Sequence, residues 1–256
     1  MRSNKNFSLV IQNISFSYGT FEKSVLEDIS IEIPKGTVTS ILGLNGSGKT
    51  TLLLIILGYL KPKTGEILLK NGNGKLDQEK LNGKVGYLPQ RENIPFDYPV
   101  NEFVLMGRLP LLNIFGRPEK DDYDEVNKNL ELLNLSEFKN KKLFEISGGE
   151  LQRVRIARTL IQNPVIVLLD EPMTHLDIKH KNFVMQIMKE MAEQGKIVIY
   201  SSHDPLDAIK RSDYCILMTK FGKATTGKSA DVISPKNLTH AFETKISPNL
   251  DYFQGN

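Results

Sequence analysis

The sequence contains one cysteine, Cys215, and no tryptophan. A single cysteine cannot form a disulfide within the chain, which is typical of a reducing compartment. The most apolar stretch, Leu52–Leu60, is less than half as long as the roughly twenty residues that a membrane-spanning helix needs. Met1–Val10 also lacks the apolar segment of a secretory signal peptide. We therefore expect a soluble protein that stays in the cytoplasm.

Neither sign of charge dominates the sequence. It has 33 Lys+Arg and 30 Asp+Glu residues, and the resulting net charge of +3 creates no field strong enough to attract nucleic acid. The chain has 256 residues, of which 40% are hydrophobic and 25% are charged, so it can bury a sizeable core. We expect a single domain and no nucleic-acid partner.

Short β-branched runs alternate with longer helical patterns, which indicates an α/β fold with a mostly parallel sheet. Nearly continuous apolar runs are typical of buried parallel strands, and three occur, at Val38–Leu42, Val165–Leu169 and Lys196–Ser201. The further strands expected are Phe7–Phe16, Ile29–Ile33, Ile67–Leu69 and Val85–Leu88.

The middle of the chain has a different pattern. Pro95, Pro99 and Pro110 interrupt the segment from Ile94 to Leu112, and Lys120–Leu135 is a polar, amphipathic helical stretch. We interpret residues 91–162 as a helical subdomain inserted into an α/β core formed by residues 1–90 and 163–256. At the end of the chain, Asn249–Gly255 faintly resembles the remnant of a protease-cleavage tag and is left out of the functional argument.

A glycine-rich segment matches the pattern G-x-x-x-x-G-K-[ST] in full: Gly43-Leu44-Asn45-Gly46-Ser47-Gly48-Lys49-Thr50. It follows the strand Val38–Leu42 and precedes the helical stretch Thr51–Leu57, which is the context that a phosphate-binding loop (P-loop) needs. Glycines let backbone N–H groups converge on phosphate oxygens. The pattern predicts that Lys49 reaches the β- and γ-phosphates of a nucleotide and that Thr50 binds Mg²⁺.

A P-loop also needs an acidic site for Mg²⁺, and Asp170-Glu171 follows the buried strand Val165–Leu169. At the end of this strand Asp170 can hold the metal through a water molecule. Glu171 is then placed to polarise an attacking water. Without the P-loop, an acidic pair that merely ends a strand would be the simpler interpretation.

The segment Ser147-Gly148-Gly149-Glu150 lies upstream of this strand and resembles the signature motif of ATP-binding-cassette (ABC) ATPases. Four more features resemble this family and occur in the expected order. They are Tyr18 as the aromatic residue that stacks on adenine, Gln90 as the Q-loop glutamine, Thr174–Asp177 as the D-loop with its Asp177, and His203 as the switch histidine.

The resemblance implies a RecA-like P-loop NTPase core with an N-terminal antiparallel β region. It implies ATP and Mg²⁺ as cofactors, with Thr51 and the loop residues at the nucleotide and with Thr50, Gln90 and Asp170 at the metal. Glu171, His203, Lys49 and Gln90 would be the catalytic residues. Three positions depart from the family pattern: Ile146 where leucine is usual, Glu150 where glutamine is common, and His175 where a small residue is usual.

In this family two cassettes pair head to tail, so each ATP would lie between one P-loop and the signature of the partner. Ser147–Gly149 opens the expected helix Glu150–Leu160, whose N–H groups and dipole can form a second anion site. The resemblance therefore implies a homodimer with the signature acting in trans.

A transporter would require separate transmembrane permease subunits, because the chain has no apolar run of spanning length. The segments Tyr87–Val100 and Val104–Arg108 resemble importers of iron–siderophore, haem or cobalamin, as do Ser202–Pro205 and Ser234–Leu238. This resemblance implies a location on the cytoplasmic face of the cell membrane and a substrate-binding protein in the complex. Two alternatives stay open: a zinc or manganese importer ATPase, and a soluble ATPase of iron–sulfur cluster assembly.

Overall fold

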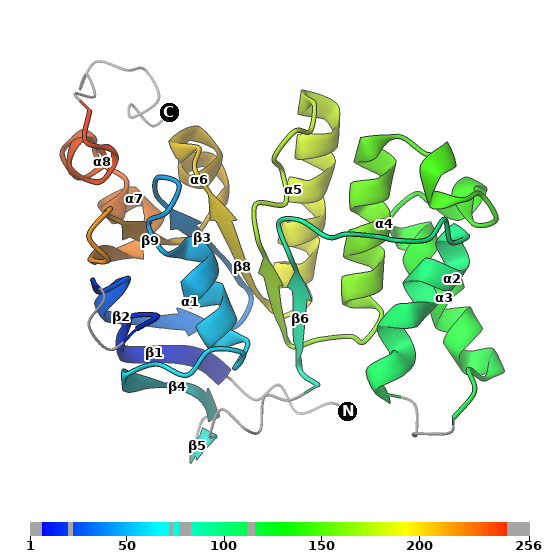
Figure 1. Ribbon diagram of the computed structural model, residues 1–256, viewed down its shortest axis with the longest axis horizontal. Coiled ribbons are helices and arrows are strands. Elements are labelled where there is room, and N and C mark those ends of the chain that lie inside the picture. Colours follow the sequence, from blue (N-terminus) through cyan, green and yellow to red (C-terminus); the bar gives the residue numbers. More distant parts are fainter. Residues whose placement is uncertain (1–6, 20–22, 72–73, 77–82, 112–115, 245–256) are drawn as a thin grey trace.

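The computed structural model describes residues 7–19, 23–71, 74–76, 83–111 and 116–244 (Figure 1). Asn249–Gly255 lies outside these residues. The strands are β1 (Phe7–Phe16), β2 (Leu26–Pro34), β3 (Thr37–Leu42), β4 (Thr64–Asn71), β5 (Gly74–Leu76), β6 (Val85–Leu88), β7 (Ile166–Leu169), β8 (Ile197–Ser202), β9 (Tyr214–Met218) and β10 (Ala224–Lys228).

The α-helices are α1 (Lys49–Ile56), α2 (Val100–Leu105), α3 (Lys120–Leu132), α4 (Gly148–Leu160), α5 (Ile178–Glu193), α6 (Pro205–Arg211), α7 (Ser229–Val232) and α8 (Pro235–Phe242). Short 3₁₀ helices are η2 (Met106–Leu111), η3 (Ser136–Phe138) and η4 (Leu143–Glu145). Figure 1 shows α2, α3 and α4 grouped at one end of the molecule, beside β6 and α5.

Two sheets form the rest of the structure. The larger sheet has the order β10-β9-β3-β8-β7-β6, and its strands pair in parallel except for β10, which pairs antiparallel to β9. The smaller sheet has the order β2-β1-β4-β5 and is antiparallel. The expected α/β class, with a mostly parallel sheet and an N-terminal antiparallel region, is confirmed.

Alternate residues of β7 belong to two different cores. Ile166 and Leu168 pack in the cluster that contains α1 and the antiparallel sheet. Val167 and Leu169 pack in the cluster that contains α4 and α5. Because a strand presents successive side chains to opposite faces, β7 is buried on both sides, and the residues that follow it are placed firmly.

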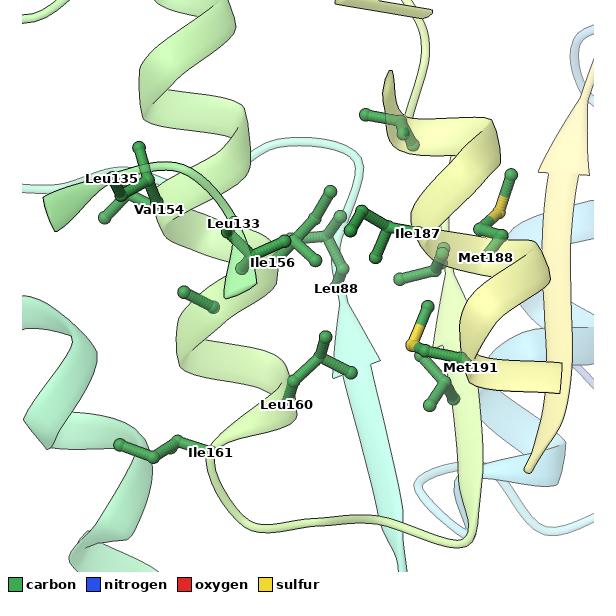
Figure 2. Close-up of a cluster of buried hydrophobic side chains, with 14 of the residues drawn as sticks. Leu88, Leu133, Leu135, Val154, Ile156, Leu160, Ile161, Ile187, Met188 and Met191 are labelled. Atoms are coloured by element: carbon green, nitrogen blue, oxygen red, sulfur yellow. The ribbon is translucent and has the colours of Figure 1, made fainter. Parts of the chain in front are cut away.

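Figure 2 shows the core that joins the helical segment to the sheet. Ile156 and Leu160 from α4 lie opposite Ile187 and Met191 from α5, with Leu88 at the end of β6 between the two helices. The helices at this end of the molecule therefore share their core with α5 and with one face of the sheet. The boundaries of the helical subdomain at residues 91 and 162 remain a prediction.

The helix expected over Lys120–Leu135 ends earlier, at Leu132. Asn134 has a φ of 52°, which lies in the left-handed region and cannot continue a right-handed helix. Leu133 and Leu135 beyond the helix end are both buried in the helical core, so their apolar character extended the sequence pattern past the helix itself.

Candidate functional site

The glycine-rich loop connects β3 to α1. Gly48 has a φ of 97°, and a Cβ atom there would lie 2.9 Å from Leu26 Cδ2, so the position requires glycine. Gly48 is the N-cap of the helix, and α1 therefore begins at Lys49 rather than at Thr51 as the sequence predicted. The first N–H groups of α1 have no partner within the helix and point toward the loop, as an anion site requires.

Ser47 provides an observation that bears directly on a ligand at this loop. Its side-chain oxygen is buried and has no hydrogen-bond partner among the described residues. A Cβ atom on Gly43 would lie 2.8 Å from this oxygen, so the loop is tightly closed around it. Leaving a buried hydroxyl unsatisfied costs roughly 1–3 kcal/mol, and a phosphate oxygen at the loop would supply the missing partner.

Lys49 lies at the centre of the site and is 6% exposed. Its Nζ donates hydrogen bonds to the carbonyl oxygens of Gly43 at 3.0 Å and Leu44 at 3.1 Å. It also lies 3.7 Å from Glu171 Oε1. Burial lowers the pKa of Lys49, and the carboxylates of Glu171 and Asp170 partly offset this effect. The ammonium is thus held between the loop and the acidic pair.

Asp170 follows β7 and is 2% exposed. Thr50 Oγ1 donates to its Oδ2 at 2.7 Å, and Ser201 Oγ donates to its Oδ1 at 2.5 Å. The structure therefore brings together Thr50 and Asp170, which come from segments far apart in the chain and are two of the three side chains predicted to hold Mg²⁺; the third is Gln90.

Four polar side chains surround the carboxylate of Glu171, which is 7% exposed. Gln90 Nε2 donates to Oε2 at 3.1 Å, and Thr174 Oγ1 donates to the same oxygen at 2.9 Å. His203 Nδ1 lies 3.5 Å from Oε2, and both residues line another pocket. Lys49, Gln90 and His203 therefore all lie at the carboxylate of Glu171, which is the fourth predicted catalytic residue.

The backbone of Glu171 is also held in an uncommon conformation. Its φ is 47°, which non-glycine residues rarely adopt, and its N–H donates to Ser201 Oγ at 2.7 Å. Ser201 thus contacts both members of the acidic pair. The sequence analysis assigned no role to Ser201 or Thr174, although both lie within segments it singled out, at the end of the β8 strand and in the D-loop.

Tyr18 lies at the rim of a pocket of about 470 Å³ that is also lined by Asn45, Gly46, Gly48, Lys49, Thr50, Thr51, Val25, Gln90 and Glu171. The Tyr18 side chain is 62% exposed, and its hydroxyl lies 3.0 Å from Thr51 Oγ1. Its ring packs edge-to-face on Phe16, with the ring centroids 5.0 Å apart. An exposed aromatic ring fixed in this way can stack on a nucleotide base.

The signature residues Ser147, Gly148, Gly149 and Glu150 do not line this pocket. Ser147 is the N-cap of α4, so the helix begins at Gly148 instead of Glu150. Ser147 N–H donates to Glu150 Oε2 at 2.7 Å, and Glu150 N–H donates to Ser147 Oγ at 3.3 Å. The hydrogen bond from the Ser147 backbone holds the pKa of Glu150 below its usual range. The start of α4 is exposed at Ser147 and Gly148.

Asp177 caps the next helix, α5. Its Oδ1 accepts from His180 N–H at 2.8 Å and lies 2.9 Å from His180 Nδ1, and the backbone hydrogen bond lowers the pKa of Asp177. His175, which departs from the family pattern, has a φ of 63° and is exposed. It lines a second pocket, of about 250 Å³, together with Glu171 and His203.

The arrangement places an anion-binding loop, a buried lysine and the Glu171 carboxylate at one pocket, and His203 at a second pocket that Glu171 also lines. Such a set can bind a polyphosphate, stabilise its negative charge and orient a water molecule for attack. Among the residues that the structure describes, no helix combines the length and apolarity that crossing a bilayer requires.

Comparisons with known proteins agree with this geometry. The profile of the family described as ABC transporter matches residues 26–174. A Helicobacter pylori ATP-binding protein assigned to iron chelatin transport is 35% identical over 93% of this chain and 94% of its own. The manganese transport system ATP-binding protein of Bacillus subtilis is 32% identical over 94% of both chains.

Among solved structures, the chain is similar to an ABC transporter assigned to the metal-chelate type, in an inward-facing conformation. The TM-score is 0.82 and the sequence identity is 29%, with 94% of this chain and 90% of the other covered. The likeness extends over almost the whole chain in both comparisons.

Proposed function

This chain belongs to the ABC transporter family, and from that premise we propose that it drives the import of a metal chelate through separate transmembrane subunits. It is an ATPase that binds and hydrolyses ATP as part of a transporter complex. The main support for the mechanism is that Lys49, Gln90 and His203 all contact the Glu171 carboxylate.

The P-loop residues Gly43 to Thr51 would hold the phosphates of ATP, and the unsatisfied hydroxyl of Ser47 supports this. Thr50, Asp170 and Gln90 would hold Mg²⁺, which neutralises phosphate charge when it is bound. No group of three or more histidine, cysteine or acidic side chains within the described chain forms a metal site by itself. This suits Mg²⁺, which is usually held by one or two protein groups together with phosphate oxygens and water.

Each catalytic residue has a separate task in this proposal. Glu171 accepts a proton from the attacking water, because its carboxylate lines the P-loop pocket, whereas that of Asp170 is bonded to Thr50 and Ser201. Lys49 supplies positive charge to the phosphates, and His203 supplies a hydrogen bond from the other side of Glu171. Gln90 would hold the carboxylate in place, and with ATP bound its side-chain amide would be one of the groups that hold Mg²⁺.

We propose that the active unit is a homodimer with two composite sites. The pocket that holds Tyr18 and the P-loop lacks Ser147 to Glu150, while the start of α4 is exposed at Ser147 and Gly148. A partner chain would supply its signature to the open side of the pocket, and its Asp177 would lie at the interface between the two chains.

The helical end of the molecule is the proposed docking surface for the membrane subunits. Several of its large apolar side chains are exposed in the region from Gln90 to the signature, namely Phe96, Leu109, Leu111 and Phe144. Docking there would place the chain on the cytoplasmic face of the membrane. A substrate-binding protein on the opposite face would complete an importer.

Docking can be tested by placing a photo-crosslinking amino acid at Phe96, which is 64% exposed. We expect crosslinks to the membrane subunit from this position and none from Tyr59, which is 78% exposed but follows α1 in the catalytic core. Crosslinks from Tyr59 alone would place the docking surface elsewhere.

Two relatives and one solved structure suggest the cargo. The iron chelatin relative and the metal-chelate transporter structure favour a chelate such as an iron–siderophore, haem or cobalamin. The manganese relative, at 32% identity, favours a second candidate, a manganese or zinc importer.

Transport by the complete complex distinguishes these cargoes. The chain would be reconstituted with its membrane subunits and binding protein in liposomes, with ATP supplied on the side of the ATPase. We expect ATP-dependent uptake of a radiolabelled ferric siderophore, haem or cobalamin, and no uptake with Glu171→Gln. Uptake of Mn²⁺ or Zn²⁺ without any chelate uptake would establish the second candidate instead.

A further inference from the structure

Two backbone carbonyl groups lie just beyond the ends of β6 and β7, next to the contact between Gln90 and Glu171. Pro89 follows β6 directly, and Pro172 follows Glu171. Because these carbonyl groups lie past the ends of their strands, they need other donors when they are enclosed. Both donors come from α4, the helix that begins at the signature.

Arg155 and Gln152 supply these donors. Arg155 Nη2 donates to Pro89 O at 2.6 Å, and Gln152 Nε2 donates to Pro172 O at 2.8 Å. The two side chains also bind each other, because Arg155 Nη1 donates to Gln152 Oε1 at 2.8 Å. Their spacing of one helical turn places them on the same face of α4. We call this pair of side chains the α4 clamp.

The α4 clamp completes a ring of contacts that includes Gln90 and Glu171. On one side, Gln90 Nε2 donates to Glu171 Oε2 at 3.1 Å. On the other side, the neighbours of these two residues, Pro89 and Pro172, are joined through the clamp. The separation of Gln90 and Glu171 is therefore controlled from α4 as well as by their own hydrogen bond.

Arg155 is held firmly in its place. Its side chain is 11% exposed, and its Nε donates to Glu92 Oε2 at 3.3 Å. Glu92 also pairs with Arg158 at 2.6 Å, and the Arg158 guanidinium lies 4.4 Å from the centre of the Phe103 ring in α2. A planar guanidinium has five N–H donors spread along its edges and can bind a carboxylate, an amide and a carbonyl that lie apart, whereas a lysine has three donors on a single nitrogen.

We propose that Arg155 is a positioning residue for ATP hydrolysis, which sets Gln90 against Glu171 through the α4 clamp. This inference rests on the catalytic role of Gln90 proposed above. Arg155 does not line the P-loop pocket, and its hydrogen bonds toward this site end at Pro89 and Gln152 rather than at Gln90 or Glu171 themselves. Its loss should therefore change turnover more than ATP binding.

The test measures steady-state ATPase activity of the full chain with saturating Mg²⁺. Arg155→Met should lower kcat by about tenfold or more, because small misplacements of catalytic groups are costly, while the KM for ATP changes less than about twofold. Arg155→Lys should recover part of the activity, since its ammonium can still reach one acceptor. Arg108→Met is the matched control: Arg108 also binds a carboxylate, Asp122, and a carbonyl, Ile161 O, and kcat should stay near that of the wild type.

A double-mutant cycle shows whether Arg155 acts through Gln90. In the Gln90→Ala background, Arg155→Met should change kcat by less than about twofold, since the residue it positions is already gone. If Arg155→Met instead lowers kcat equally in both backgrounds, or leaves kcat unchanged in the wild-type background, the clamp proposal is wrong. If Gln90→Ala alone leaves kcat unchanged, the role of Gln90 in the proposed function fails as well. Thermal melts confirm that each variant is folded.

Discussion

Glu171 combines two properties that rarely occur together in one residue. Its carboxylate is almost buried among polar partners, and its backbone has a φ of 47°. Such a conformation costs on the order of 1–3 kcal/mol and persists only where surrounding contacts hold it. Here Ser201 holds the N–H, and Gln90 and Thr174 hold the carboxylate. The strain supports a catalytic role for this residue.

Glu171→Gln should separate chemistry from binding. Glutamine keeps the shape of the side chain and removes its charge and basicity, so we expect ATP hydrolysis to fall by about 10²–10⁴-fold, the usual contribution of a general base. ATP binding should survive, because Lys49, Thr50 and Asp170 are unchanged. Phosphate release and equilibrium nucleotide binding measure the two effects.

Glu193→Gln is the matched control, because Glu193 is 66% exposed at the end of α5. This variant should hydrolyse ATP at the wild-type rate. Undiminished hydrolysis by Glu171→Gln would remove Glu171 from the catalytic role.

Among the structural elements, the buried strands were the easiest to predict. β3, β7 and β8 are nearly continuous apolar runs, and the sequence-based bounds lie within one residue of those in the structure. α5 was not predicted, although Val184, Met188 and Met191 are buried at helical spacing. β10 has few apolar residues, and its place at the edge of the sheet follows from pairing with β9, which no local pattern specifies.

The start of α3 carries a cap that links it to the preceding helical turn. Asp122 Oδ2 accepts from Glu119 N–H at 2.9 Å, and its Oδ1 lies 2.8 Å from Arg108 Nε. The hydrogen bond from the Glu119 backbone holds the pKa of Asp122 below its usual range, and the Arg108 guanidinium adds to this effect. The ionised carboxylate therefore stabilises the folded state.

Asp122→Asn should lower the free energy of unfolding by about 1–2 kcal/mol at pH 7, as the loss of a cap and its ion pair suggests. Because the folded pKa is depressed, this contribution is complete above the unfolded pKa and is lost as pH falls below about 4. Urea unfolding of both proteins should show a constant difference from pH 7 to about 5 and a smaller one near pH 3. A difference that grows toward low pH would contradict the assignment.

At the scale of the whole molecule, the proposed catalytic residues meet because parallel strands end at the same edge of the sheet. Gln90 follows β6, Glu171 follows β7 and His203 follows β8, and these strands are neighbours. The sequence predicted each residue from its own motif. It could not predict the supporting contacts of Thr174 and Ser201, because these depend on how neighbouring strand ends are placed in space.

The exposed signature and the open pocket predict the behaviour of the molecule in solution. With hydrolysis blocked in Glu171→Gln, ATP and Mg²⁺ should hold two chains together across two composite sites. We expect a dimer with ATP–Mg²⁺ and a monomer without it, measured by light scattering on a sizing column. The double variant Lys49→Ala/Glu171→Gln should stay monomeric, because the P-loop has lost its cation. A dimer that forms equally well in the double variant would show that nucleotide does not join the chains.

The position of Tyr18 allows nucleotide binding to be followed by fluorescence. The chain has no tryptophan, and Tyr18 is an exposed aromatic ring at the pocket proposed to bind the nucleotide. Tyr18→Trp would therefore create a lone indole whose fluorescence belongs to a single place in the protein. We expect its emission to be quenched as ATP is titrated, since stacking on the base changes the surroundings of the indole. The same titration with inorganic triphosphate, which has no base, should leave the emission nearly unchanged, so the light emitted from one side chain would follow adenine alone.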